Sequence, residues 1–198
     1  IGGDHSMAIA TIADSLNKYP DLKVLWFDAH ADINTISSSC TNNYHGMPLS
    51  FLTGLDYYKK FNFIDNKLSF NRLMYVGIRD IDSYEKKVIE SQNIKYILVN
   101  EIRTDLIKSI DKILNFMGNS PIHISFDVDV MDPLLIHSTG TRVKNGLYFD
   151  ETKNILDMII DKNIINMDIT ELNLDIGINE EKMNSLKNTL NLFEKYIK

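Results

Sequence analysis

Short apolar segments, rich in β-branched and aromatic residues, alternate along the chain with longer segments of mixed polarity. The short segments predict buried strands, because runs that are apolar on both faces are typical of parallel sheets. These predicted strands span 22–27, 73–78, 95–99, 121–126 and 164–168.

The longer segments carry apolar residues at three- and four-residue spacing, which predicts amphipathic helices. These predicted helices span 6–18, 83–92, 105–117, 150–162 and 180–197. The segment Gly118-Asn119-Ser120-Pro121 is typical of a helix end, and the acids at 150–151 and 180–181 favour helix first turns. Strands and helices that alternate in this way predict an α/β fold with a mostly parallel sheet.

The chain has 198 residues, of which 44% are hydrophobic, so we expect a single domain over residues 1–198. No apolar run reaches the roughly 18 to 20 residues that a membrane-spanning helix needs, and we expect no membrane partner. The formal charge is −6, and the 21 Lys and Arg residues are scattered. A nucleic-acid partner is therefore not expected, because phosphate binding needs clustered cations.

Cys40 is the sole cysteine, which excludes an intrachain disulfide and a thiolate zinc site and fits a reducing compartment. We accordingly expect a cytoplasmic location. The chain opens on Ile1-Gly2-Gly3-Asp4-His5, as though at the end of a strand. This opening leads us to expect that part of the fold, and any targeting segment, precedes Ile1.

Acids and histidines gather where two predicted strands end. Asp28, His30 and Asp32 follow the strand at 22–27, and Asp127 and Asp129 follow the strand at 121–126. In open α/β sheets, ligands bind beyond the carboxyl ends of the strands. If the backbone stays extended, the alternate spacing directs Asp28, His30 and Asp32 to one side, where they would form half of a metal site.

The Asp-x-His-x-Asp pattern is the informative part, since random shuffling of this composition produces it in roughly one sequence in twenty. His5 offers a further imidazole, although a turn or capping role is the simpler interpretation of this region. Together these residues supply four carboxylates and two imidazoles. Such a set suits two bridged divalent ions, favours Mn²⁺ because it contains no thiolate, and predicts hydrolysis by a water molecule of lowered pKa.

These segments resemble the arginase and agmatinase family of ureohydrolases. The resemblance rests on Gly2-Gly3-Asp4-His5-Ser6, on Asp28-Ala29-His30-Ala31-Asp32, on Ser125-Phe126-Asp127-Val128-Asp129 with Asp132-Pro133, and on Glu171. It covers essentially the whole chain and implies a three-layer αβα fold, with at least one strand and one helix ahead of Ile1. It also implies a homotrimer.

The resemblance further implies two Mn²⁺ ions per subunit, with Asp28 and Asp127 bridging them. One ion would be held with His5 and Asp32, and the other with His30 and Asp129. A hydroxide that bridges the ions would attack the guanidinium carbon of L-arginine and give L-ornithine and urea.

The remaining site residues are also implied by the resemblance. Asp32 would transfer a proton to the leaving amine, His45 would exchange protons with solvent, and Glu171 would pair with the guanidinium. The α-amino and α-carboxylate groups of the substrate would contact Asn34, Thr41, Asn43, Asp82, Glu85 and Thr141. Agmatine lacks the α-carboxylate, so Asn34 and Asn43 favour arginine.

Several alternatives remain open at this stage. Glu171 taken alone is a solvated acid, His45 a turn residue, and Asp82 with Glu85 a helix cap. Another guanidino compound, such as agmatine or guanidinobutyrate, is an alternative substrate, and a non-catalytic, metal-stabilised scaffold is an alternative of another class. His123 and His137 match no family ligand, and Arg142 stands where a Pro is usual.

Overall fold

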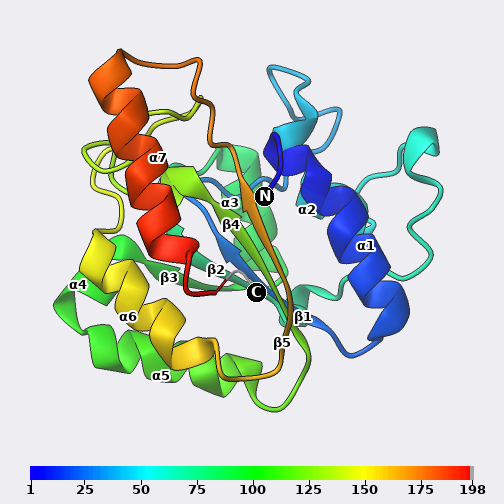
Figure 1. The fold of residues 1–198 in the computed structure, drawn as a ribbon. Coiled ribbons are helices and arrows are strands. Elements are labelled where there is room, and N and C mark those ends of the chain that lie inside the picture. The colour runs from blue at the N-terminus through cyan, green and yellow to red at the C-terminus, as the bar shows by residue number, and fades with distance from the viewer. Residues whose placement is uncertain (197–198) are drawn as a thin grey trace.

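A five-stranded parallel sheet forms the centre of the molecule in the computed structural model, which describes residues 1–196 (Figure 1). The strand order across the sheet is β3-β2-β1-β4-β5. The strands are β1 (Lys23–Phe27), β2 (Leu73–Ile78), β3 (Lys95–Leu98), β4 (Ile122–Asp127) and β5 (Ile164–Thr170).

The chain starts the sheet at its centre and builds it outward in two directions. From β1 it adds β2 and then β3 on one side, and it then returns to add β4 and β5 on the other. Phe27, at the end of β1, is paired with both Val76 of β2 and Phe126 of β4. The strand order therefore reverses between β1 and β4, and the crevice beyond their carboxyl ends is the expected position of a ligand site.

Helices cover both faces of this sheet. One face packs against α1 (Ala8–Lys18), α2 (Pro48–Thr53) and α3 (Ser83–Ser91). The other face packs against α4 (Val99–Thr104), α5 (Leu106–Met117), α6 (Phe149–Ile159) and α7 (Asn179–Phe193). Short 3₁₀ helices lie between these elements at His5–Met7, Tyr44–Gly46, Lys59–Phe61, Phe70–Arg72 and Val128–Val130. The predicted three-layer α/β fold is confirmed.

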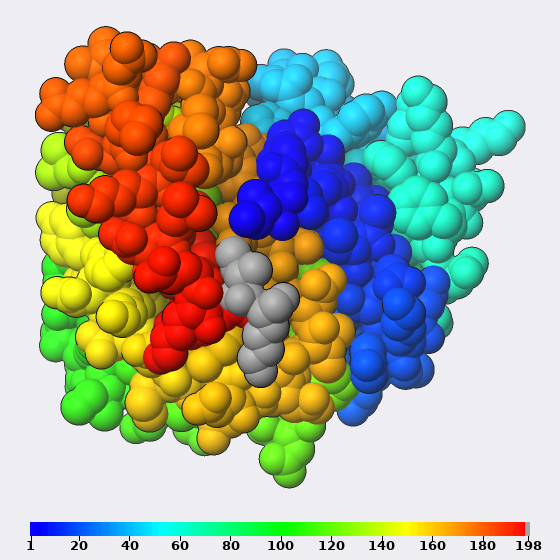
Figure 2. Space-filling model, in the orientation of Figure 1, coloured from blue at the N-terminus to red at the C-terminus, as the bar shows by residue number. Residues whose placement is uncertain are grey.

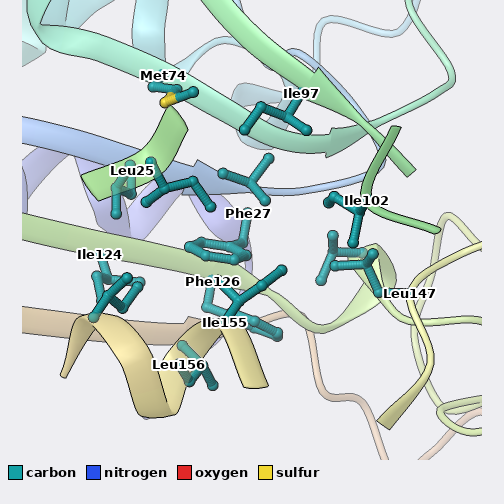
Figure 3. Packing of buried hydrophobic residues seen from close by; sticks show 14 of the residues in the cluster. Leu25, Phe27, Met74, Ile97, Ile102, Ile124, Phe126, Leu147, Ile155 and Leu156 are labelled. Carbon is teal, nitrogen blue, oxygen red and sulfur yellow. The ribbon is translucent and has the colours of Figure 1, made fainter. Parts of the chain in front are cut away.

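Most of the core divides into two apolar clusters because neighbouring strand residues point to opposite faces of the sheet, and a smaller third cluster contains Ile9, Met47 and Phe51. Leu25 and Phe27 pack on the side of α5 and α6, whereas Val24 and Trp26 pack on the side of α1. Figure 3 shows Phe27 beside Phe126 of the adjacent strand, with ring centroids 5.3 Å apart. Burial on both faces explains why these strands have no polar face in the sequence.

The predicted elements fit the structure closely, although the helix predicted at 150–162 ends at Ile159 and the strand predicted at 164–168 extends to Thr170. Three further differences concern the short helices and the C-terminal helix. The strand predicted to reach Val99 ends at Leu98, where the backbone N–H of Leu98 donates to Glu101 Oε2 and α4 begins. The pattern did not predict α2 or α4, each of which has only six residues. The last predicted helix runs to Phe193 rather than to 197, a residue that lies outside the described range. Among the described residues, no helix is long and apolar enough to cross a membrane.

The first residues of the chain lie against the end of β5. The Gly2 N–H donates to the Ile169 carbonyl, and the Glu171 N–H donates to the Gly3 carbonyl. Figure 2 shows this N-terminal segment at the surface, and it also shows the segment near residue 60 projecting at the right of the view. The contacts with β5 carry the chain directly to His5, next to the ends of β1 and β4.

Gly77 allows the turn after β4 to approach β2 closely. It has a φ of +92°, and a Cβ added there would lie 2.5 Å from Val130 Cγ2. We expect Gly77→Ala to lower the free energy of unfolding by about 1–3 kcal/mol through backbone strain, with the steric clash adding to this loss. Urea denaturation measures the effect. Gly140→Ala is the control, because nothing lies within 4 Å of its added Cβ, and an equal loss in both variants would refute the explanation.

Candidate metal centre

The ends of β1 and β4 bring the predicted carboxylates together. Asp28 follows β1 and Asp127 ends β4, and both are almost completely buried. The 3₁₀ turn Val128–Val130 then places Asp129 on the same side, and its N–H donates to Asp127 Oδ1 at 2.8 Å. His5 reaches this point from the short helix that precedes α1.

His5 is surrounded by carboxylate oxygens. Its Nδ1 lies 3.0 Å from Asp28 Oδ2, 3.2 Å from Asp32 Oδ2 and 3.2 Å from Asp127 Oδ2. His5, Asp28 and Asp127 could hold a metal ion with one ligand atom each. These three residues belong to one of the two ligand groups that the resemblance implies, which also contains Asp32.

The second ligand group shares Asp28 with the first. His30 Nδ1 lies 3.0 Å from Asp129 Oδ2 and 3.3 Å from Asp28 Oδ1, and the three residues could hold a second ion. Asp28 therefore contributes one oxygen to each group. The structure brings together all six of the predicted metal ligands.

The surroundings of His5 fit a metal ion. Its Nε2 lies 2.9 Å from Ser125 Oγ, and its ring stacks on Trp26 with a centroid distance of 3.9 Å. Within the described part of the chain, its buried Nδ1 makes no hydrogen bond of regular geometry, although the three carboxylate oxygens lie close to it. When Nε2 donates to Ser125, the Nδ1 lone pair faces three carboxylates, an arrangement that a cation would satisfy.

The electrostatics of the cluster also favour bound cations. Burial and repulsion from Asp129 and Asp28 raise the pKa of Asp127 well above its usual range. Burial opposes a charge on His30, but Asp129 and Asp28 raise its pKa to about 12. Burial likewise opposes a charge on His5, yet its contacts with Asp127, Asp28 and Asp32 raise its pKa. Protons on His5 and His30 thus place positive charge beside the carboxylates. Divalent ions bound at the same position would place more positive charge there.

The backbone conformation at Asp32 differs from the extended one that the sequence analysis assumed. The segment after β1 does not stay extended, since Asp32 has a φ of +48°. The turn separates the three side chains: His30 lies against Asp129, whereas Asp32 lies against His5. Burial and the Asp28 charge raise the pKa of Asp32 to about 8.

A pocket of about 390 Å³ lies over this cluster. His30, Asp32 and Asp127 lie in its wall, and so does His45. All six residues predicted to contact the substrate also line it: Asn34, Thr41, Asn43, Asp82, Glu85 and Thr141. The fold therefore gathers the predicted substrate contacts from four separate segments of the sequence.

Several of these six residues are already hydrogen-bonded within the protein. Asn34 Nδ2 donates to Asp82 Oδ2, and Asn34 Oδ1 accepts from Ser38 Oγ, both at 2.9 Å. Glu85 accepts from the backbone N–H groups of Ile33 and Asp82, and burial raises its pKa to about 7. Asp82 and Glu85 thus have the helix-capping role that the sequence left open, at the start of α3.

Glu171 lies beside the pocket rather than in its wall. It lines a neighbouring pocket of about 300 Å³ with Gly3 and Asp4. Its Oε1 accepts from the His5 backbone N–H at 2.8 Å and lies 3.2 Å from His45 Nδ1. His45 thus connects Glu171 to the main pocket.

The Glu171 contact holds the pKa of His45 above its ordinary value. We expect Glu171→Gln to lower the His45 pKa, because the neutral amide no longer stabilises the imidazolium. In the wild type, the stabilising contact is therefore present at low pH and lost as the pH rises through the raised pKa. An NMR titration of the His45 ring protons measures the shift. An unchanged His45 pKa in the variant would exclude Glu171 as the cause.

Sequence reasoning assigned no role to three residues at the site. Ser125 and Trp26 touch His5, and Trp26 Nε1 also donates to Asp28 Oδ2 at 2.9 Å. Cys40 is exposed and lines the pocket. The Ser-x-Asp-x-Asp spacing is a signal for Ser125, because alternate strand residues point to the same face, but nothing in the sequence marks Trp26 or Cys40.

The remaining histidines lie outside the cluster. His123 is buried in β4, as the sequence indicates, where its Nε2 lies 2.8 Å from Asp168 Oδ2. His137 lies in a loop, also as predicted, and Arg142 Nη1 lies 2.6 Å from its Nε2. Arg142, which stands where the family usually has a Pro, therefore places a cation against His137.

Comparison with known proteins identifies the family. Residues 1–192 match the model of the Arginase family. The chain is 38% identical to the arginase of Saccharomyces cerevisiae over 195 residues, which are 91% of this chain and 58% of the yeast protein. It is 35% identical to human Arginase-1 over 199 residues, which cover 96% of this chain and 62% of the human protein. The chain thus spans between half and two thirds of the length of these curated relatives.

Solved structures agree with the sequence comparison. The arginase of Entamoeba histolytica, crystallised with L-ornithine, matches with a TM-score of 0.88 at 33% identity, over 97% of this chain and 68% of that protein. The arginase of Bacillus subtilis matches with a TM-score of 0.87 at 29% identity, over 98% of this chain and 70% of that one. From its sequence, its fold and its cluster of aspartates and histidines, the chain belongs to the arginase family.

Proposed function

We propose that the protein hydrolyses L-arginine to L-ornithine and urea with two Mn²⁺ ions. The observation that carries the proposal is the pair of ligand groups that share Asp28 beneath a polar pocket. Asp and His ligands without thiolate suit Mn²⁺, and four carboxylates balance the charge of two divalent ions. His5 and Asp32 would complete one ion's ligands, and His30 and Asp129 the other's, with Asp28 and Asp127 shared.

The metal ions would supply a water molecule of lowered pKa, activated for attack at neutral pH. The residues of the chain would then orient the substrate and move protons. Glu171 would pair with the planar guanidinium, which matches a carboxylate in geometry and charge. Water adds to the guanidinium carbon, and the bond from that carbon to the substrate side-chain nitrogen breaks.

Two side chains are placed to handle the protons. Asp32 would accept the proton that the attacking water loses and deliver it to the departing amine of ornithine, since its carboxylate lies in the pocket wall beside His5. His45 is half-buried between the pocket and Glu171, so it can exchange protons with solvent. Together these transfers release neutral urea and leave the positive charge of the guanidinium on the side-chain amine of ornithine, without net change in the protein.

The far end of the pocket favours an amino acid over a simple guanidino amine. Thr41 and Asn43 are exposed in the pocket wall and can donate to an α-carboxylate, while Asp82 can accept from an α-ammonium. Agmatine has no carboxylate for these donors.

A substrate comparison tests the proposal. After loading with Mn²⁺, the protein is incubated separately with L-arginine and agmatine, and urea is quantified with ornithine or putrescine. We expect urea and ornithine in equal amounts from arginine, and a much lower kcat/KM for agmatine. Faster turnover of agmatine would favour the related activity. Tight metal binding without urea from either compound would favour the non-catalytic scaffold.

A further inference from the structure

Arg79 follows β2 and lies outside the wall of the substrate pocket. Within the described residues, its partly buried guanidinium donates only to backbone carbonyls. The acceptors at 2.8 to 3.2 Å belong to Gly77, Asp129, Val130, Val143 and Lys144, and the Met131 carbonyl lies at 3.5 Å. A guanidinium has five N–H donors in a fixed plane, and here all five are used. One side chain therefore connects the end of β2, the turn after β4 and the loop at 143–144.

The contacts of Arg79 also form a closed ring that includes both metal-ligand segments. Its backbone N–H donates to the Ala29 carbonyl at 2.8 Å. The Ala29 N–H donates to Asp129 Oδ1 at 3.1 Å, and Arg79 Nη2 donates to the Asp129 carbonyl at 2.8 Å. Ala29 lies between Asp28 and His30 in the sequence. The ring thus joins the segment that carries His30 to the turn that carries Asp129.

We propose that Arg79 is a positioning residue for one half of the metal centre, the group formed by Asp28, His30 and Asp129. The inference rests on the proposed two-metal site. By holding the Asp129 backbone to Ala29, Arg79 fixes the separation between His30 Nδ1 and Asp129 Oδ2, which is 3.0 Å. A ligand pair held in place before the ion arrives loses less conformational freedom on binding.

The same contacts predict that the effect is selective. The other ligand group is held by different residues: Ser125 contacts the His5 ring, and Trp26 stacks on it. Neither of these contacts passes through Arg79. Loss of the guanidinium is therefore expected to weaken the ion at His30 and Asp129 and to spare the ion at His5.

Thr141 gives a second consequence of the same arrangement. Its Oγ1 donates to Asp129 Oδ2 at 3.0 Å, and it lies two residues before Val143, whose carbonyl Arg79 binds. Arg79 thus steadies both the backbone of Asp129 and the loop whose hydroxyl orients the Asp129 carboxylate.

The variant Arg79→Met tests the inference, because it keeps a long apolar stem and removes all five donors. Mn²⁺ binding is followed by titration calorimetry and by electron paramagnetic resonance on the purified chain. We expect one tight ion per chain to remain and the second to bind about 10- to 100-fold more weakly. The resonance spectrum should change from that of a coupled pair to that of an isolated ion. Arg79→Lys should show the same selective loss, since an ammonium keeps the charge without the planar set of donors.

Arg103→Met is the matched control. Arg103 donates to the Gly146 carbonyl and to Glu151, so it holds the same loop without contacting the turn after β4. This variant should keep two tight ions. Two unchanged sites in Arg79→Met would overturn the inference, and so would equal weakening of both sites. If Arg79→Met does not fold, Arg79→Lys decides by the same criteria. A wild-type chain that binds fewer than two ions would instead refute the proposed metal centre, and this inference with it.

Discussion

Replacing Asp127 by asparagine is expected to abolish tight binding of at least one Mn²⁺ ion and to reduce arginine turnover by roughly two to four orders of magnitude. Asp127 is 3% exposed and has one oxygen 3.2 Å from His5 Nδ1. Breaking one buried, charge-paired contact costs about 3–5 kcal/mol, and each 1.4 kcal/mol is a factor of ten in affinity. Calorimetry with Mn²⁺ and a urea assay measure the two effects.

Without metal, the Asp127→Asn substitution is expected not to lower the stability of the fold. Burial and the neighbouring Asp129 and Asp28 charges raise the pKa of Asp127, so the ionised group destabilises the metal-free fold at neutral pH. The neutral amide removes this repulsion and keeps an oxygen that can accept from the Asp129 N–H. We therefore expect Asp127→Asn without metal to be at least as stable as the wild type, and to gain less in Tm when Mn²⁺ is added.

Asp132→Asn is the matched control for this variant. Asp132 is buried in the following loop, where it accepts from the Leu134 and Gly146 N–H groups, at 3.0 and 3.1 Å. Its replacement should lower stability without removing a metal ion. Two ions bound at wild-type affinity in Asp127→Asn would contradict the assignment of Asp127 as a bridging ligand.

Replacing Glu171 by glutamine is expected to lower kcat/KM for arginine by roughly 30-fold to a few thousand-fold while both Mn²⁺ ions remain bound. The variant keeps the size of the side chain and loses the charge that would pair with the guanidinium. Loss of one partner of a buried charge pair costs about 2–5 kcal/mol or more, and part of that cost is the unpaired substrate cation. Steady-state kinetics with metal analysis separates this effect from metal loss.

Glu181→Gln provides a control for the loss of a glutamate that contacts a histidine. Glu181 Oε2 lies 3.4 Å from His137 Nε2, outside the metal centre. The kcat/KM of the Glu181→Gln variant should stay at the wild-type value. If Glu171→Gln also keeps full activity, Glu171 does not orient the substrate, and its role is limited to its contacts with His5 and His45.

Much of the fold could be predicted from the sequence because its strands are buried on both faces. Continuous apolar runs identified β1, β2 and β4 to within one residue at each end. The short helices were missed for physical reasons. Residues of α2 are almost all buried, so no polar face marks its period. In α4, Val99 favours a strand by propensity, but Glu101 binds the Leu98 N–H and starts a helix instead.

The metal ligands could be predicted because their chemistry is local in the sequence. Asp28, His30, Asp127 and Asp129 follow strands directly, and the sheet brings those strand ends together. The left-handed backbone at Asp32 is a tertiary feature that spacing does not reveal.

The supporting residues could not be predicted in the same way. Trp26 reads as an ordinary core residue, yet it stacks on His5 and donates to Asp28. Arg79 reads as a charged residue after a strand, and its role depends on carbonyls fifty or more residues away. Both residues act through contacts that only the folded chain creates.

Anomalous diffraction from crystals of the Mn²⁺-loaded protein tests the central claim most directly, because it locates each ion independently of activity. Two manganese peaks are expected at the ends of β1 and β4. One should contact His5, Asp28 and Asp127, and the other should contact Asp28, His30 and Asp129. A single peak, or none, at saturating Mn²⁺ would contradict the two-metal centre.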